Sequence, residues 1–207
     1  MGGSAVTMGN WIDKVSSIVD IWYPGEEGGH AVAAVLSGEY NPGAKLPITF
    51  PVSEAQLPLV YNHKPTGRGD DYENLTGLPL FPFGYGLSYT TFDYSNLMID
   101  KPTAKKGDNI TVSFVVTNTG KLAGDEVAQL YLRDQIASVA RPVQALKGFE
   151  RIHLAAGASK TIKLTLNPED FEMLNEKMET VIEPGDFTIM IGSSSRDIRL
   201  KKTVTLQ

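Results

Sequence analysis

Residues 110–117, Ile-Thr-Val-Ser-Phe-Val-Val-Thr, decide the fold class of this chain. Alternate residues of the stretch are apolar, which is the period of a β-strand with one face in a core. The same alternation recurs at 162–166 and at 187–191. It continues at 198–206, where Lys202 interrupts the register and predicts a bulge or a sheet edge.

Turn-forming residues separate these strands. Lys106-Gly107-Asp108, Asn118-Thr119-Gly120 and Pro184-Gly185-Asp186 stand between the alternating runs, and each combines glycine with polar or proline residues that favour turns. From Phe92 onward the pattern predicts about seven strands over about 115 residues, which is the organisation of a β-sandwich.

The first 60 residues read differently. Apolar residues spaced three and four apart predict an amphipathic helix over 10–22, and a second short helix is expected over 27–37 with Gly38 as its stop. Residues 46–50, between two prolines, are expected to be extended. Two helices and one extended segment cannot cover both faces of a sheet, so this stretch indicates the end of a larger α/β domain.

Residues 52–89 show no sustained period and are rich in Pro, Gly, Asn and Asp, which indicates a long surface connection. Its aromatic residues favour a connection that is packed down: Tyr61, Tyr72, Phe81, Phe83, Tyr85 and Tyr89. We therefore expect three parts, an α/β fragment at 1–60, a linker at 61–91 and a sandwich at 92–207.

Composition excludes several classes of protein. The formal net charge is −5, so a basic nucleic-acid-binding face is not expected, and the absence of cysteine removes disulfides, Cys-ligated zinc and thiol nucleophiles. No run approaches the roughly 18 apolar residues of a membrane span. The opening residues lack the pattern of a secretory signal, so we expect no export signal in the chain and the compartment stays unknown.

Few residues suggest chemistry. A glycosidase needs two carboxylates across a cleft, and the tight acidic groups outside strands and turns are Glu26-Glu27 and Asp70-Asp71-Tyr72-Glu73. The first is expected to start a helix, and the second to lie in a solvated loop or to bind a ligand. His30, His63 and His153 show no metal-ligand spacing. The aromatic run 81–92 is read as a tether, with a sugar-stacking platform as the alternative. We expect no catalytic, cofactor-binding or metal-binding residue, and no cofactor.

Five motifs resemble one family. They are WYPGEEGGHA (22–31), NPGAKLPITFP (41–51), PLFPFGYGLSYTTF (79–92), VTNTGKLAGDEVAQLYL (116–132) and RPVQALKGFERIHLAAG (141–157). In this order they are similar to the C-terminal region of glycoside hydrolase family 3, the β-glucosidases and β-xylosidases. The resemblance implies a mainly β chain: a fibronectin type III-like (immunoglobulin-like) β-sandwich preceded by an incomplete α/β segment.

The family's catalytic machinery is expected outside this chain. The resemblance implies a retaining mechanism with a nucleophilic Asp in an N-terminal barrel and an acid/base Glu early in the second domain, and neither position falls in these residues. The expected partners are therefore the missing barrel and sandwich domains, with a β-linked oligosaccharide as the substrate of the parent. Nucleic acid is not expected, and a periplasmic or extracellular parent is compatible with the family.

The expected function is the non-catalytic C-terminal portion of such an enzyme, which completes the second domain and buttresses the barrel. The alternative is a free-standing β-sandwich module that binds carbohydrate or protein. A third possibility is a truncated remnant without function. Completion of a larger domain would leave the apolar side chains of Trp11, Ile18 and Trp22 exposed in the isolated chain.

Overall fold

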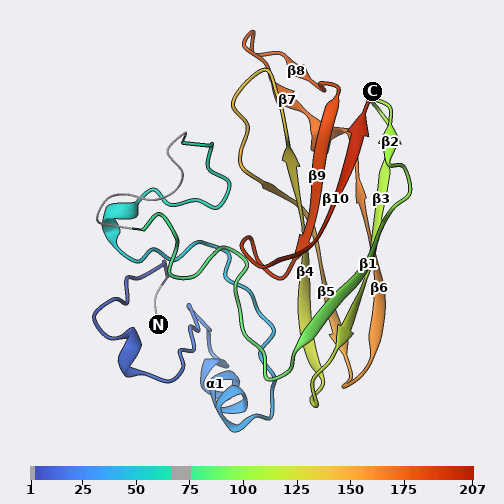
Figure 1. Cartoon of the computed structure of the whole chain (residues 1–207). Helices are drawn as coiled ribbons and strands as arrows, with labels where there is room; N and C mark the ends of the chain where they lie inside the picture. Colours follow the sequence, from blue (N-terminus) through green and yellow to red (C-terminus); the bar gives the residue numbers. More distant parts are fainter. Residues whose placement is uncertain (1–2, 67–75) are drawn as a thin grey trace.

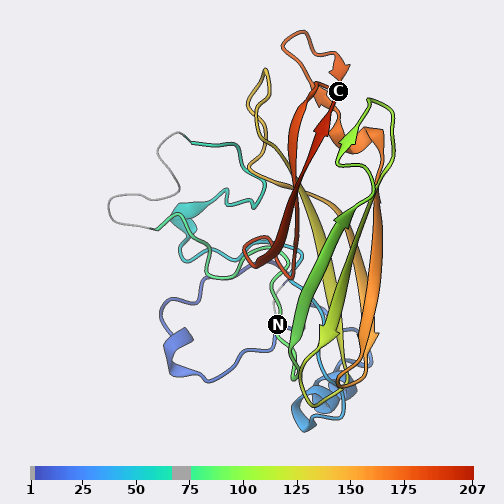
Figure 2. The same cartoon turned by 45° about the vertical axis from the view of Figure 1, so that its right-hand side comes forward.

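The computed structural model describes residues 3–66 and 76–207, and its largest part is a β-sandwich that begins at Phe92. Two layers of strands face one another in Figure 1 and in the turned view of Figure 2. One layer is an antiparallel sheet of three strands in the order β1 (Phe92–Ile99), β3 (Ile110–Asn118) and β6 (Ser159–Leu166).

The other layer has five strands, in the order β2-β10-β9-β4-β5. Their bounds are β2 (Thr103–Ala104), β4 (Gly124–Asp134), β5 (Ala145–Leu154), β9 (Gly185–Gly192) and β10 (Ile198–Leu206). The pairing of β2 with β10 is parallel, and the other pairings are antiparallel. A small separate ladder joins β7 (Met173–Leu174) and β8 (Thr180–Val181), which follow the short 3-10 helix η3 (Pro168–Phe171).

The core lies between the two sheets and confirms the alternating pattern. On β3 every second residue is buried, from Ile110 to Asn118. The largest fully buried side chains of this core are Phe114, Phe171, Phe187, Ile110, Leu130, Ile162, Leu166, Ile189, Ile191 and Val112. The sandwich fold inferred from period two is therefore confirmed.

The bulge or sheet edge expected at Lys202 is not found there, since β10 lies between β2 and β9. Lys202 pairs regularly with Ile189, whereas the register of β10 against β9 shifts between Ile198 and Leu200. The positive charge of Lys202 needs no bulge, because its Nζ lies at the surface and donates to the carbonyl of Leu97 over 3.5 Å.

The prediction of a helix over residues 10–22 is wrong. Only the 3-10 turn η1 (Ile12–Lys14) forms there, and Trp11, Val15 and Val19 are 40%, 45% and 48% exposed. An amphipathic helix gains most of its stability from packing its apolar face. Among the described residues only the end of this face finds a partner, where Trp22, which was expected to be exposed, is half-buried with its ring 6.2 Å from that of Phe50. The segment therefore stays irregular and displays its apolar side chains.

The second expected helix is confirmed as α1 (Gly28–Ser37), and Gly38 ends it in the left-handed conformation at φ 79°. Residues 46–50 form no strand, but they contact the linker through an isolated bridge between Phe50 and Phe81 and through backbone hydrogen bonds of Leu46 with Gly84 and Tyr85. A further 3-10 turn, η2 (Glu54–Gln56), follows. Figures 1 and 2 place α1 near the end of the sandwich where β3 leads into β4. No helix in the described ranges is long and apolar enough to span a membrane.

Candidate functional site: the junction on strand β4 and the adjoining cleft

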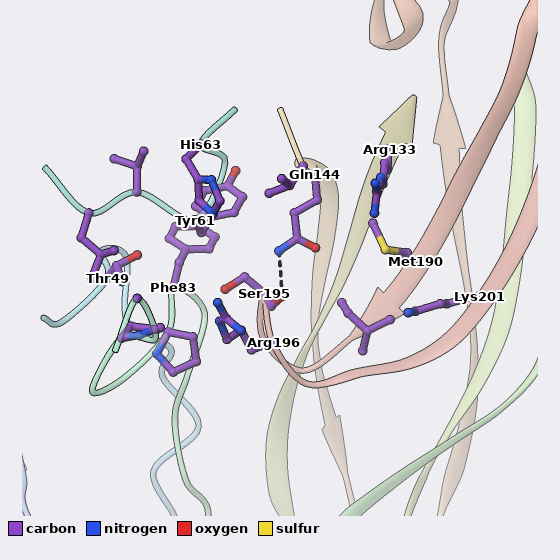
Figure 3. A pocket seen from close by; sticks show the side chains of 17 residues that line it. Thr49, Tyr61, His63, Phe83, Arg133, Gln144, Met190, Ser195, Arg196 and Lys201 are labelled. Atoms are coloured by element: carbon purple, nitrogen blue, oxygen red, sulfur yellow. Dashed lines mark hydrogen bonds between the residues drawn. The ribbon is translucent and has the colours of Figure 1, made fainter. Parts of the chain in front are cut away.

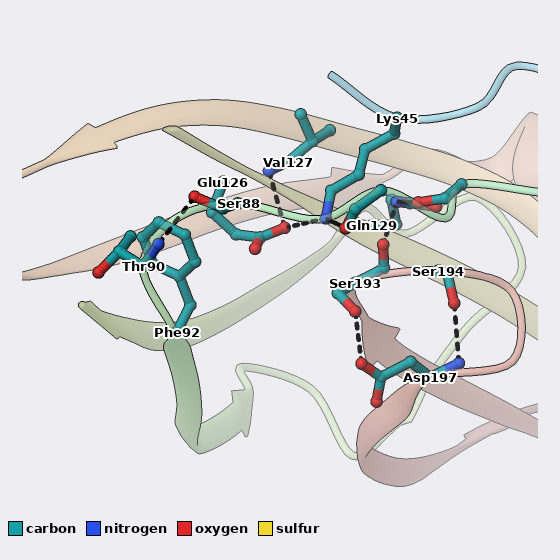
Figure 4. A network of polar contacts seen from close by, with 12 residues as sticks. Lys45, Ser88, Thr90, Phe92, Glu126, Val127, Gln129, Ser193, Ser194 and Asp197 are labelled. Carbon is teal, nitrogen blue, oxygen red and sulfur yellow. Dashed lines mark hydrogen bonds and ion pairs between the residues drawn. The ribbon is translucent and has the colours of Figure 1, made fainter. Parts of the chain in front are cut away.

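The N-terminal part is held to the sandwich by a buried ion pair. Lys45 Nζ lies 2.9 Å from Glu126 Oε1, and the two side chains are only 13% and 7% exposed (Figure 4). The same carboxylate oxygen accepts a hydrogen bond from the backbone N–H of Val127 over 2.9 Å, and Lys45 also donates to the carbonyl of Gly86. A charge this well buried is stable only when paired, so each residue fixes the other.

Glu126 occupies a core-facing position of β4. It has the same parity as Ala128, Leu130 and Leu132, which are buried between the sheets. A carboxylate at such a position needs a cationic partner, and Lys45 is the partner at 2.9 Å, from residues 41–51 outside the sandwich. This parity is the sequence signal that could have revealed the pair.

Further charged groups continue this cluster. Arg199 of β10 pairs with Asp197 at 2.8 Å, and its guanidinium lies 5.1 Å from the ring centre of Tyr94. Burial, and next the negative charge of Glu126, raise the pKa of the Tyr94 hydroxyl well above its ordinary value. The hydrogen bond from Arg199 holds the pKa of Asp197 below its ordinary value. In this cluster each positive side chain lies beside a negative one. Their attraction holds residues 41–51 against β4 and β10.

A second contact ties the loop after α1 to the sheet. Arg151 of β5 donates from Nε to Asp125 over 2.9 Å and from Nη2 to the hydroxyl of Tyr40 over 2.9 Å, while His153 Nδ1 lies 2.6 Å from Asp125. Partial burial raises the pKa of the Asp125 carboxyl, but the hydrogen bonds to His153 and Arg151 outweigh it. The pKa therefore lies below its ordinary value.

Two glycines permit the close approach of these segments. A Cβ on Gly43 would lie 2.6 Å from the Cβ of Asp125, and a Cβ on Gly84 would lie 2.1 Å from Oε1 of Gln129. Gly84 also has a φ of 80°, a conformation that other residues rarely adopt. Gly43 of the NPG stretch and Gly84 of the FGYG stretch are thus required by packing against β4.

The linker is packed down on the outer face of β4, as its aromatic residues predicted. The rings of Tyr61 and Phe83 stack with centres 4.3 Å apart, and Tyr61 meets Tyr131 edge to face at 5.9 Å. Gln129 of β4 donates to the carbonyls of Gly84 and Ser193 over 3.2 and 2.7 Å. Tyr72, which was expected to take part, lies outside the described residues.

An open cleft of about 520 Å³ adjoins this linker (Figure 3). One wall is formed by linker residues, among them Tyr61, His63 and Phe83, and the other by the outer face of β4, β9 and β10. Gln144 and the β9–β10 loop lie between the walls, where Gln144 Nε2 donates to the carbonyl of Ser195 over 2.7 Å.

The carboxylates and histidines noted in the sequence do not form one site in the described residues. Glu27 precedes α1 and contacts His30 at 2.6 Å, with both side chains largely exposed. His63 lines the cleft and His153 contacts Asp125. The cluster Asp70-Asp71-Tyr72-Glu73 lies outside the described residues. Within the described ranges no group of three or more His, Asp or Glu side chains is arranged to hold a metal ion.

Two family models match the chain in succession. The model of the glycosyl hydrolase family 3 C-terminal domain matches residues 1–89, and the model of the fibronectin type III-like domain matches residues 126–195. Their order agrees with the structure, in which an N-terminal part docks on a β-sandwich.

Curated relatives and solved structures agree with these matches. A β-xylosidase of Formosa agariphila is 43% identical over all of this chain, and a periplasmic β-glucosidase of Salmonella typhimurium is 41% identical over 96% of it. The chain spans only 29% and 27% of these two proteins. The β-glucosidase of Listeria innocua in complex with glucose superimposes with a TM-score of 0.86 at 36% identity, over 90% of this chain and 27% of that one. β-Glucosidase 3B of Thermotoga neapolitana in complex with α-D-glucose superimposes with a TM-score of 0.85 at 34% identity, over 99% of this chain and 30% of that one.

Proposed function

Since this chain matches the C-terminal region of family 3 glycoside hydrolases and is a portion of such a larger protein, we propose that it completes and buttresses the catalytic domains that precede it. The proposal divides the chain into the end of an α/β domain at 1–60, a linker at 61–91 and the sandwich from 92 onward. The start of β1 at Phe92 supports the last boundary.

One observation carries this proposal. The segment 11–23 displays Trp11, Val15, Ile18, Val19 and Tyr23 to solvent, although its spacing is that of an amphipathic helix. Several exposed large apolar side chains in one short segment are typical of an interface. The residues that follow are fixed to the sandwich by Lys45 and Glu126. The sandwich then holds the exposed segment against the rest of the parent.

The parent is proposed to hydrolyse β-linked glucosides or xylosides, because the matched relatives are named β-glucosidases and β-xylosidases. Its nucleophile and its acid/base residue are proposed to lie in the preceding domains. We propose that this chain contains no catalytic residue. A retaining hydrolase needs both carboxylates, so the chain alone would not turn over substrate.

Reading the source gene in frame upstream of the Met1 codon tests this proposal first. A frame that encodes a barrel and the start of an α/β domain is expected. The two parts, expressed together, should then copurify and hydrolyse an aryl β-glucoside or β-xyloside. A stop codon directly upstream would overturn the proposal.

A second candidate is a free-standing module that binds a neutral polysaccharide, and the half-exposed Trp11 favours it as a stacking surface. Titrating soluble β-glucans against the tryptophan fluorescence of the chain separates the two. Saturable quenching that Trp11→Ala abolishes supports the module, whereas no change supports the buttress.

A further inference from the structure

Large apolar side chains are exposed around the end of the sandwich where α1 lies. They come from α1, from the loop that follows it, from the end of the linker and from the β3–β4 turn. Each is between 47% and 72% exposed, and together we call them the apolar patch: Leu36, Tyr40, Leu87, Tyr89 and Leu122. Figures 1 and 2 both show α1 near the β3–β4 turn, so these segments meet at one end of the molecule.

Asn41 joins the segments that carry the apolar patch. Its Nδ2 donates to the carbonyl of Ala123 over 2.9 Å, and its Oδ1 accepts from the backbone N–H of Tyr89 over 2.7 Å and from the Ser88 hydroxyl over 2.9 Å. The hydroxyl of Tyr89 donates to the carbonyl of Val35 over 2.8 Å. Each member of the patch is one of these bonded residues or its neighbour in the sequence, so the patch is one local surface.

The two tyrosines of the patch are held in place before any partner binds. The hydroxyl of Tyr89 donates to α1, and the hydroxyl of Tyr40 accepts from Arg151 Nη2 over 2.9 Å. Both rings are thus fixed at their polar end, while 47% of each residue stays exposed. A surface that is ordered in advance loses little free energy to ordering when a partner binds.

Helix α1 lacks the cover that its composition calls for. Its residues 31–36, Ala-Val-Ala-Ala-Val-Leu, are all apolar. Six consecutive residues make more than one full turn, so apolar side chains face every direction around the axis. A helix of this kind is normally buried, yet Gly28 is its one buried residue.

The part of the parent that precedes this chain is the partner that fits the patch. The chain matches the C-terminal region of its relatives and spans only 29% and 27% of the two curated ones, so most of such a protein lies before it. Helix α1 begins at Gly28, five positions after Tyr23, where the exposed segment 11–23 ends. A domain that covers this segment is therefore within reach of α1 and of the patch.

We propose that an apolar surface of the preceding domains packs on the apolar patch and thereby contacts α1 and the sandwich at once. Leu122 belongs to the β3–β4 turn, so the sandwich itself contacts those domains, in addition to residues 1–60. Burial of apolar area drives the contact, because the patch consists of leucine and tyrosine side chains. The inference rests on the function proposed for the chain and adds the place and the chemistry of the contact.

The sequence contains no cysteine, so one introduced thiol reports on one position. Leu122→Cys puts the thiol in the patch. Ile136→Cys is the matched control, because Ile136 is 85% exposed and follows the other end of β4, whose eleven residues span roughly 35 Å. Each variant of the full 207-residue chain is mixed with the preceding domains, expressed from the upstream part of the source gene. Its reaction with a maleimide is followed by the mass of the chain.

Binding of the preceding domains should slow the labelling of Leu122→Cys by at least about tenfold and that of Ile136→Cys by less than about twofold, since a buried contact excludes water and reagent. Leu122→Ser and Leu87→Ser should each weaken the binding about tenfold, the scale of one buried leucine side chain. Ile136→Ser should leave the affinity within about twofold of that of the original chain. Unchanged urea denaturation of each variant alone shows that it is folded.

The outcomes separate this inference from the function on which it rests. If the preceding domains bind but Leu122→Cys stays as reactive as Ile136→Cys, or if both serine variants of the patch bind as tightly as the original chain, the inference alone is overturned. If the upstream gene encodes no such domains, or if they do not bind, both are overturned. Sedimentation of the chain alone tests a second copy as the occupant. A dimer that protects Leu122→Cys would overturn the inference in favour of that copy.

Discussion

Lys45 and Glu126, 81 positions apart in the sequence, form an ion pair of 2.9 Å in which both side chains are almost completely buried. The chain offers a matched surface pair for comparison. Lys160 and Glu150 are also 2.9 Å apart, but their side chains are 50% and 35% exposed. Distance is therefore the same in the two pairs, and burial is what differs.

Breaking the buried pair should cost far more than breaking the exposed one. Glu126→Gln or Lys45→Met leaves an uncompensated charge in the junction and is expected to lower the free energy of unfolding by about 3–5 kcal/mol. Lys160→Met should cost less than about 1 kcal/mol. Urea denaturation of the three variants measures both values, and similar losses for the two pairs would contradict a structural role for the junction.

Gly43 should not tolerate a methyl group. Gly43→Ala places a Cβ within 2.6 Å of that of Asp125 and is expected to destabilise the chain by about 1–3 kcal/mol. Gly29 in α1 is the control, because a Cβ there meets nothing within 4 Å. Gly29→Ala should stabilise the helix by about 0.5–1 kcal/mol. Thermal unfolding of both variants gives the two signs, and a gain at Gly43 would show that the contact with β4 is looser than described.

Acid should weaken the contact between β4 and β5 through Asp125. The pKa of this carboxyl is lower in the folded chain than its ordinary value of 3.8. A group of this kind contributes stability above its unfolded pKa and loses it as the pH falls through its folded pKa. Asp125→Asn should therefore lose less stability than the original chain between about pH 4 and pH 2. Urea titrations across this range measure the difference, and parallel curves would disprove the role given to Asp125.

The chain alone should not hydrolyse an aryl β-glucoside or β-xyloside, because both carboxylates of the retaining mechanism are proposed to lie elsewhere in the parent. Release of the chromophore by purified chain is the measurement, with the copurified two-part protein as the positive control. Hydrolysis by the chain that Asp70→Asn, Asp71→Asn or Glu73→Gln abolishes would place catalysis within these residues instead.

Local periodicity was sufficient to predict the sandwich. Strand β3 can be predicted from residues 110–117 because its neighbouring strands and its core partners belong to the same chain. Its alternate apolar residues are therefore buried, as the pattern requires. The stop of α1 at Gly38 is equally local, since a left-handed conformation favours glycine.

Features that depend on distant partners could not be predicted in this way. The apolar spacing of 10–22 predicts a helix only if something covers its face, and the described residues leave Trp11 and Val15 exposed. The pairing of Lys45 with Glu126 depends on how residues 41–51 dock on β4, which the sequence does not show. The core-facing position of Glu126 indicates only that some cation must lie beside it. The cleft likewise depends on where the linker crosses the sheet.

The position of β10 sets the order in which this part of the molecule can be made. Residues 198–206 lie between β2 and β9, so β2 has no hydrogen-bonded neighbour in the sheet until they arrive. The pairing of Thr103 with Thr205 joins residues that a ribosome synthesises 102 steps apart. The five-stranded sheet is therefore complete only after residues 198–206 have left the ribosome. Until then β2 has no strand to pair with and one edge of β9 is open, although β4, β5 and β9 can already pair.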